Sequence, residues 1–180
     1  DSSPSRGLGD VYKRQIEWVG LHRHHHRFSD QPIDHHDAGR GLWWSHSEWM
    51  LHNIPALKEL DRYAGDLQVD PFYRWLDRWF LLLQIPLGLG LYWIGEAAQV
   101  HGGGIGLVLW AIPLRLAIVY HVTWLVNSAT HAFGYRNFDC PDLSRNCWWV
   151  ALLSFGEGWH NNHHAHPCLL YTSDAADDLV

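Results

Sequence analysis

The sequence contains little cysteine and no excess of positive charge. Three cysteines occur in 180 residues, and the spacing of Cys140 and Cys147, the two in its central part, fits no zinc site, redox motif or disulfide framework. The formal net charge is −6 at pH 7. Nucleic-acid-binding proteins carry a basic patch or stripe. The composition therefore argues against a nucleic-acid partner and against a disulfide-stabilised secreted domain.

The two ends of the chain differ from the sequence between them. Residues 5–15, SRGLGDVYKRQ, and residues 168–177, CLLYTSDAAD, are translations of the transposase adapters used to prepare DNA sequencing libraries. We therefore expect residues 1–15 and 168–180 to be adapter-derived and not native. The native part is then residues 16–167, and we expect its gene to have been cut on both sides.

Tryptophan is abundant, with 12 residues, and two long apolar runs are present. Tryptophan is enriched at membrane interfaces. The runs cover residues 79–95 and 105–126, and a helix needs about 20 apolar residues to cross a bilayer core. The nine residues between them, EAAQVHGGG, predict a short turn and an antiparallel transmembrane hairpin. Two buried helices of a soluble protein are the alternative, against which the lengths and the flanking tryptophans argue.

Such a hairpin returns the chain to the side of the membrane from which it started. Segments before and after the hairpin can therefore meet on that side. Between them, residues 42–60 can form one amphipathic helix, either interfacial or soluble. Arg115, in the second apolar run, should face protein or water instead of lipid.

Histidine is also abundant, and all 15 histidines lie within residues 16–167. Two runs share the spacing i, i+3, i+4, which places three imidazoles on one face of a helix. These are His22, His25 and His26, followed by His160, His163 and His164. Asn127 and His131 are spaced i, i+4 where the second apolar run ends. Seven imidazoles and an amide exceed what one tetrahedral ion accepts, so the pattern predicts two metal ions.

The choice of metal follows from the kind of ligand. Imidazole suits zinc, copper, iron and nickel alike. A hydrolytic zinc site normally uses three protein ligands and an open position, so a surplus of histidine fits a redox-active pair better, and iron activating oxygen is our choice. A solvated histidine-rich tract is the alternative, but two runs with identical internal spacing favour a metal site.

The same residues resemble a known family. HRHHHRFSD, VTWLVNSATHAFGYR, NCWWVALLSFGEGWHNNHHAHP and DPFYRWLDRWF are similar to membrane fatty-acid desaturases. The likeness is to the delta-9 acyl-lipid or acyl-CoA type of cyanobacteria and other bacteria, and it covers residues 16–167. It implies an all-α membrane protein in which a transmembrane hairpin and cytosolic histidine-box helices form a di-iron site.

The resemblance also implies an activity. It is that of an oxidoreductase with two non-haem iron ions and O2 as co-substrate, which introduces a cis double bond into a saturated acyl chain, at the delta-9 position. The acyl carrier, whether glycerolipid, coenzyme A or acyl carrier protein, stays open. The electron donor is of the ferredoxin or cytochrome b5 type. The location implied is a bacterial inner membrane or a thylakoid-like membrane.

Particular residues take roles by their position in the family motifs. The iron ligands implied are His22, His25, His26, His131, His160, His163 and His164, with Asn127 acting through a water. Trp18 and Thr123 would line the bend of an acyl tunnel, with ordinary packing as the alternative. Asp30 and Glu157 are candidates to orient ligand histidines, with a solvated carboxylate as the alternative. The other histidines are expected at surface or packing positions: His24, His35, His36, His46, His52, His101 and His166.

One family motif is missing from this sequence. The desaturases carry an earlier HxxxxH box at the end of a preceding spanning helix, and residues 16–167 do not contain it. We therefore expect this chain to be a fragment that lacks two ligands and the first hairpin, and to be inactive by itself.

Two other functions are compatible with a histidine-rich membrane protein. A related membrane hydroxylase or ketolase would keep the iron and insert oxygen, and the HNNHH, GEGWH and NSATH contexts favour the desaturase. A membrane zinc transporter or sensor belongs to a different class, and it would place histidines or carboxylates along a path inside the spans. Only His121 and Arg115 are candidates there, which weakens this function.

Overall fold

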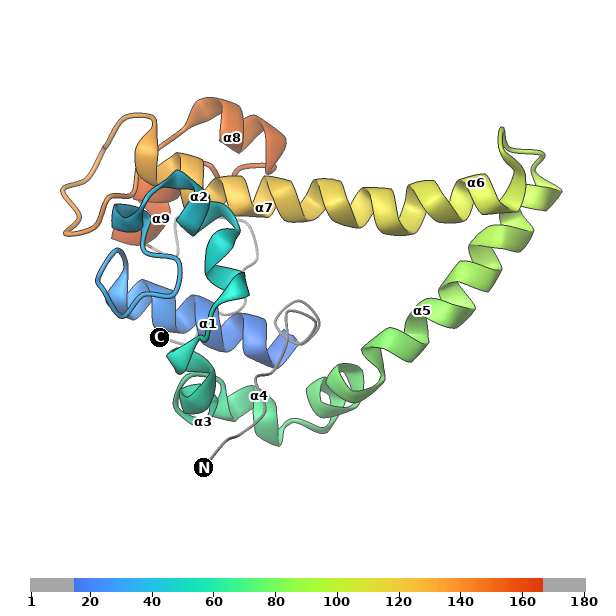
Figure 1. Ribbon diagram of the computed structural model, residues 1–180, viewed down its shortest axis with the longest axis horizontal. Coiled ribbons are helices and arrows are strands. Elements are labelled where there is room, and N and C mark those ends of the chain that lie inside the picture. Colours follow the sequence, from blue (N-terminus) through green and yellow to red (C-terminus); the bar gives the residue numbers. More distant parts are fainter. Residues whose placement is uncertain (1–14, 167–180) are drawn as a thin grey trace.

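The computed structural model describes residues 15–166, and within this range all regular elements are helices (Figure 1). No β-strand occurs in these residues, although Asn146 forms isolated bridges with Tyr135 and Trp159. The predicted all-α class is confirmed. The elements are α1 (Gln15–Phe28), η1 (Ala38–Arg40), α2 (Leu42–His46), η2 (Glu48–Leu51), η3 (Pro55–Glu59), α3 (Leu60–Tyr63), α4 (Gly65–Val69), α5 (Pro71–Ala97), α6 (Gly103–Leu109), η4 (Trp110–Leu114), α7 (Arg115–Ala132), α8 (Trp148–Leu153) and α9 (His160–Ala165).

Two long helices form a hairpin that opens into a V (Figure 1). One arm is α5, and the other is the continuous helix α6–η4–α7, residues 103–132. The arms meet at the turn and diverge from there. At the turn the backbones touch because both positions are glycine: a Cβ on Gly95 would lie 2.7 Å from the Cα of Gly104. The predicted hairpin is therefore present, with diverging arms.

Both arms are longer than the apolar runs predicted at residues 79–95 and 105–126. The first begins at Pro71 because Asp70 caps it, accepting hydrogen bonds from the N–H groups of Phe72 (2.7 Å) and Tyr73 (3.4 Å). The second ends at Ala132. In their most apolar 18-residue windows, 6% of the first arm and 0% of the second are buried. Both helices are long and apolar enough to cross a membrane.

The second arm contains a π turn at Trp110–Leu114. Pro113 has no N–H to donate, and proline inside a helix disturbs the ladder of hydrogen bonds. The exposed Arg115 follows the turn directly, and its Nε donates to the carbonyl of Ala111 at 2.9 Å. The guanidinium thus satisfies a carbonyl of the widened turn.

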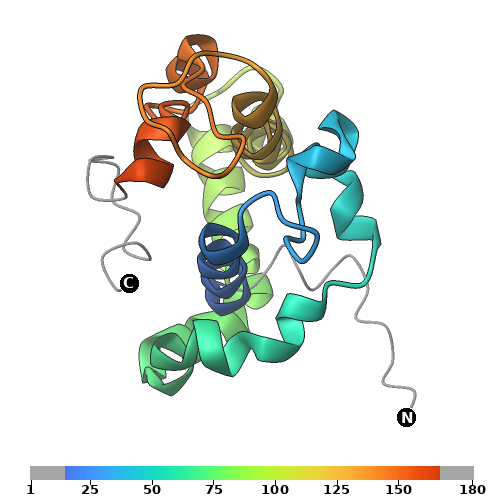
Figure 2. The ribbon, with the colours of Figure 1, turned by 90° about the vertical axis from the view of Figure 1, so that its left-hand side faces the viewer.

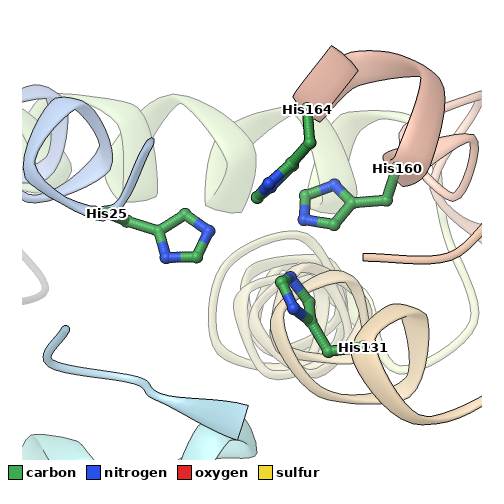
Figure 3. A group of neighbouring side chains, drawn as sticks. All are labelled: His25, His131, His160 and His164. Atoms are coloured by element: carbon green, nitrogen blue, oxygen red, sulfur yellow. The ribbon is translucent and has the colours of Figure 1, made fainter. Parts of the chain in front are cut away.

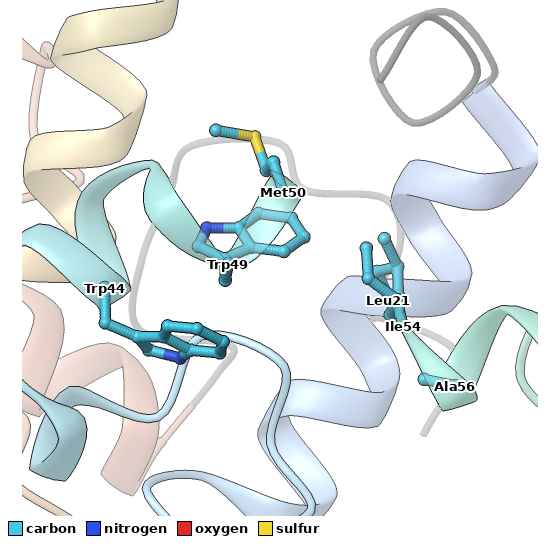
Figure 4. Packing of buried hydrophobic residues seen from close by; sticks show 6 residues of the cluster. All are labelled: Leu21, Trp44, Trp49, Met50, Ile54 and Ala56. Atoms are coloured by element: carbon cyan, nitrogen blue, oxygen red, sulfur yellow. The ribbon is translucent and has the colours of Figure 1, made fainter. Parts of the chain in front are cut away.

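At the open end of the V, shorter elements surround α1. In two views α1 lies between the α7–α9 group and the η3–α4 segment (Figures 1 and 2). Six buried apolar residues pack together beside it (Figure 4): Leu21, Trp44, Trp49, Met50, Ile54 and Ala56. Burying one large apolar side chain stabilises a fold by roughly 1.5–3 kcal/mol. This cluster therefore fixes α2, η2 and η3 against α1.

The single amphipathic helix expected over residues 42–60 does not form. The segment is divided into α2, η2 and η3. Ser47, with φ −153°, and His52, with ψ 164°, both have backbone conformations outside the helical region. Ile54 is extended before Pro55. A residue that precedes proline is disfavoured in the helical region, so the sequence itself interrupts the helix there.

Arg23 holds α1 against the segment that follows the apolar cluster. Its guanidinium donates to both carboxylate oxygens of Asp66, at 2.7 and 3.1 Å, and to the carbonyl of Tyr63 at 2.8 Å. Such a forked contact fixes direction as well as distance. The register of α1, and of every histidine on it, is tied to α3 and α4 in this way.

Candidate metal centre

The seven predicted ligand histidines lie together at the open end of the V, in two groups. In each group the potential ligand atoms are all within 4.8 Å of one another. The four-histidine cluster is His25, His131, His160 and His164 (Figure 3). The three-histidine cluster is His22, His26 and His163. The structure therefore brings together all seven residues that the sequence singled out.

Three helices supply these side chains. The i, i+3, i+4 spacing places the three histidines of α1 on one face of that helix, and it does the same for the three histidines of α9, as predicted. His131 comes from the last turn of α7. Each of α1 and α9 serves both clusters. The two clusters are adjacent, because the ring centroid of His26 in the three-histidine cluster lies 4.8 Å from that of His164 and 5.6 Å from that of His25, both in the four-histidine cluster.

Carboxylates hold one side of the four-histidine cluster. The Nδ1 atoms of three of its rings each lie 2.8 Å from an aspartate oxygen. The pairs are His25 with Asp34, His131 with Asp30, and His164 with Asp142. Because an ionised carboxylate only accepts hydrogen bonds, Asp30 and Asp142 favour the rings of His131 and His164 with the proton on Nδ1 and a lone pair on Nε2.

The Nε2 atoms of this cluster are suited to bind a cation. The Nε2 atoms of His25, His131, His160 and His164 are all buried and make no hydrogen bond. Buried polar atoms in native proteins almost always have a partner, so four such nitrogens in one place require an explanation. Four Nε2 lone pairs facing a common point are what a bound metal ion uses. The donor set therefore fits a metal ion.

The protonation of the imidazoles agrees with this fit. Burial, and then the neighbouring histidines, hold the pKa of His25 and of His160 well below the usual value. The pKa of His26 is lowered for the same reasons. These rings are therefore neutral at physiological pH, which is the form that binds metals.

The aspartates respond differently to their surroundings. Burial acts to raise the pKa of Asp30, but the hydrogen bond and charge of His131 and two backbone N–H donors hold that pKa below its usual range. Asp142 behaves alike: its burial is outweighed by His164 and Ser144, and its pKa is lowered. Burial raises the pKa of Asp34 to about 8, and the charge of a cation held by His25 would oppose that effect.

A family model of fatty acid desaturases matches residues 15–172. The chain belongs to the fatty acid desaturase family. It is 53% identical over 151 residues to the sn-1 stearoyl-lipid 9-desaturase of Synechocystis sp., covering 84% of this chain and 45% of that protein. It is 47% identical over 156 residues to the sn-2 palmitoyl-lipid 9-desaturase of Nostoc sp., covering 84% and 52%.

A plant relative is more distant. The chain is 38% identical over 161 residues to an acyl-CoA 5-desaturase of Anemone leveillei, covering 88% of this chain and 48% of that protein. This desaturase chain spans about half the length of the curated relatives it matches. The predicted family membership is confirmed.

Asparagines support the short α9 helix of this desaturase. The side-chain oxygen of Asn146 accepts from the N–H groups of Asn161 (3.1 Å) and Asn162 (3.2 Å). The side-chain oxygen of Asn161 in turn accepts from the N–H groups of Asn137 and Phe138, both at 2.8 Å. The side chains of Asn146 and Asn161 thus anchor the helix that carries three histidines, a role that was not predicted from the sequence.

Two of the three residues predicted to contact substrate or water, Trp18 and Asn127, line the same pocket. A small open pocket is lined by Trp18, Leu21, His22, His35, His36, Trp49 and Asn127. Asn127 therefore lines the same pocket as His22 of the three-histidine cluster, and its role through a water stays a prediction. Thr123 is not among the lining residues, and its hydroxyl donates to the carbonyl of Val119 in its own helix at 3.0 Å. The roles of Trp18 and Thr123 in binding an acyl chain stay predictions.

The histidines outside the ligand spacing differ in their exposure to solvent. His52, His101 and His166 are exposed, as expected. His24, His35 and His36 are buried beside the clusters. His46, the last residue of α2, contacts α7: its Nδ1 lies 3.0 Å from the Ser128 hydroxyl and its Nε2 3.2 Å from His121 Nδ1.

One further group of potential ligand atoms contains His25, Asp34 and His36. Because His25 Nδ1 already forms a hydrogen bond to Asp34, this group belongs to the support of the four-histidine cluster. Asp34 and Asp142 were not predicted from the sequence, because they lie in loops without a periodic pattern. Asp30 was named as a candidate and does contact a ligand histidine, whereas the role of Glu157 stays a prediction.

Proposed function

We propose that the complete protein is an oxygen-dependent acyl desaturase that introduces a cis double bond at the delta-9 position of a saturated acyl chain. The observation that carries the proposal is the pair of adjacent histidine clusters at the open end of two long apolar helices. Stearoyl-lipid and palmitoyl-lipid 9-desaturases among its relatives support the reaction and its position.

Two iron ions are the cofactors that we propose. One would be held by the four-histidine cluster, and the other by the three-histidine cluster with Asn127 acting through a water. Iron bound there would supply the redox chemistry by which O2 and two electrons remove two hydrogens from an unactivated acyl chain. Imidazole alone does not select iron over zinc or copper, so the choice of iron depends on the family.

The protein's own residues have separate tasks in this proposal. Asp30, Asp34 and Asp142 hold three imidazoles with Nε2 turned inward. Trp18 and Leu21 give the pocket beside His22 an apolar wall suited to a methylene chain. Thr123 would contribute to the bend of the chain farther along α7. Enclosure by such walls keeps water away from the reacting carbons.

The substrate and its delivery follow from the two exposed apolar helices. We propose a membrane glycerolipid as the acyl carrier, because two relatives are named for lipid-bound acyl chains; the acyl-CoA desaturase of Anemone leveillei keeps coenzyme A as the alternative. A ferredoxin or a cytochrome b5 would supply the electrons. The histidine clusters would lie on the cytosolic side of a bacterial inner membrane or thylakoid-like membrane.

The experiment is to express the uninterrupted gene in a bacterium that supplies electrons and to analyse membrane fatty acids by gas chromatography and mass spectrometry. We expect new monounsaturated chains, with the double bond located at carbon 9 by derivatisation. Hydroxylated or keto products would instead support the hydroxylase or ketolase. An unchanged profile together with bound zinc would support a transporter or sensor.

A further inference from the structure

Asp30 occupies an unusual backbone position. It lies two residues after the end of α1 and has a left-handed conformation, with φ 57°. Non-glycine residues adopt this region rarely, and aspartate and asparagine tolerate it better than most. Strained backbone of this kind is kept where the surroundings impose it, which directs attention to what Asp30 contacts.

The Asp30 carboxylate joins three parts of the fold. Its Oδ2 lies 2.8 Å from His131 Nδ1, at the end of α7, and accepts from the N–H of Leu143 at 2.7 Å. Its Oδ1 accepts from the N–H of Ala38, at the start of η1, at 3.1 Å. The side chain is only 5% exposed. One carboxylate thus contacts the end of α7, the start of η1 and the loop that contains Leu143, all beside the four-histidine cluster.

The backbone of Asp30 reaches a second ligand histidine. Its N–H donates to Asp34 Oδ2 at 2.9 Å, and the same oxygen lies 2.8 Å from His25 Nδ1. Asp30 therefore orients His131 through its side chain and His25 through its main chain. The Nε2 atoms of both rings are buried without a hydrogen bond and belong to the same cluster.

We infer that Asp30 is a positioning residue of the four-histidine cluster, which fixes the ring of His131 with its proton on Nδ1 and holds the Nε2 atoms of His131 and His25 toward a metal ion. The inference rests on the proposed function only in naming a metal as the ligand. Asp30 itself touches no substrate or metal in this arrangement. It sets which nitrogen of the His131 ring is free to bind.

Replacing the carboxylate by an amide is the sharpest perturbation. In Asp30→Asn the shape is kept, but the charge is lost and the amide can present an N–H to His131 Nδ1. The ring would then carry its proton on Nε2, where it blocks metal binding. Asp37→Asn is a matched control, because Asp37 is also buried and caps η1 by accepting from the N–H of Gly39 at 2.8 Å.

The test is Co2+ binding to the purified 180-residue chain in detergent micelles, followed by the visible absorption of the bound ion. Cobalt is bound by imidazole, and its spectrum reports the ligands directly. We expect Asp30→Asn to weaken Co2+ binding by about 10–100-fold and to change the spectrum. Asp37→Asn should bind Co2+ as the parent does. Equal affinity and an unchanged spectrum in Asp30→Asn would overturn the inference.

A double-mutant comparison separates positioning from a general structural effect. If Asp30 acts through its ligand histidines, Asp30→Asn should cost less Co2+ affinity in a His131→Ala background than in the parent chain. A merely structural residue would give the same loss in both backgrounds. Full additivity of the two losses therefore contradicts the inference.

A second measurement needs no variant of Asp30. Nitrogen-15 NMR of labelled histidine rings reports which nitrogen carries the proton, and the signal of His131 is assigned from its loss in His131→Ala. A proton on Nδ1 is expected, and a proton on Nε2 would overturn the inference. Should the parent chain bind no Co2+, the proposed metal centre would be contradicted, while the ring protonation would still decide the role of Asp30.

Discussion

His26 and His163 lie 137 positions apart in the sequence, and their Nε2 atoms are 2.8 Å apart in the structure. Two ring nitrogens at this distance either share a proton or face the same cation. The pair joins α1 to α9 and brings together the two histidine runs that the sequence placed on opposite sides of a hairpin. It also makes both runs necessary for the same centre.

Loss of one histidine from either cluster should abolish the activity of the complete gene product. For His26→Ala and His160→Ala we expect desaturated product to fall by at least about 100-fold, the upper end of what loss of a mere outer-shell partner causes. Membrane insertion should persist, because neither residue lies on α5 or α7. The measurement is the fatty-acid profile together with the amount of protein in the membrane. His101→Ala, at an exposed position outside the clusters, is the control, and full activity in either test variant would contradict the ligand assignment.

The folded chain should lose stability as the pH falls below about 6.5. Burial lowers the pKa of His24 from 6.5, and burial with its histidine neighbours lowers that of His36 to about 3. Between these values the unfolded chain binds protons that the folded chain does not, so the free energy of unfolding decreases as the pH falls. Thermal unfolding in detergent at pH 7.5, 6.5 and 5.5 checks this. A midpoint temperature that stays constant or rises toward pH 5.5 would show that these rings are not buried in neutral form.

Removing Arg23 should loosen α1 from α3 and α4. The Arg23 side chain is 12% exposed and its partner Asp66 is 43% exposed, so solvent weakens the charge contribution. We expect Arg23→Ala to reduce the free energy of unfolding by about 1–2 kcal/mol, and Arg23→Lys to restore only part of it because lysine cannot form the fork. Urea or thermal unfolding measures the loss. Arg62→Ala is the control, since its contact with Glu59 is longer, at 3.5 Å, and exposed.

The two ends that the sequence predicts to be adapter-derived should be dispensable. Deleting residues 1–15 and 168–180 should leave the helix content and the metal binding of the chain unchanged, because the deletion removes only Gln15 from α1 and all clustered histidines lie between His22 and His164. Circular dichroism and Co2+ titration of the shortened chain test this. Loss of expression or of helix content on deletion would show that these residues belong to the native protein.

Periodic features of the sequence predicted the parts of the structure that depend on helices. The i, i+3, i+4 spacing identified six of the seven clustered histidines, and His131 was identified by its i, i+4 spacing from Asn127. The apolar runs identified both arms of the hairpin. The prediction failed for residues 42–60, where conformations at Ser47 and His52 and the proline at position 55 outweigh an amphipathic pattern.

The supports of the centre were harder to predict. Asp34 and Asp142 lie in loops, and a loop carboxylate has no spacing that relates it to a histidine far away or on another element. Asn146 and Asn161 meet only after α9 has folded against the loop before α8. Such contacts depend on how elements pack, which a single sequence does not encode in any local pattern.

The sharing of α1 and α9 between the two clusters fixes the spacing of the centre mechanically. α1 gives His25 to one cluster and His22 and His26 to the other, and α9 gives His160 and His164 to one and His163 to the other. The backbone positions of neighbouring residues on a helix are fixed by the helical rise and by the rotation per residue, and side-chain motion does not change them. The distance between the two histidine clusters is therefore set by two helices that contribute to both, and a shift of α1 or α9 displaces both clusters together.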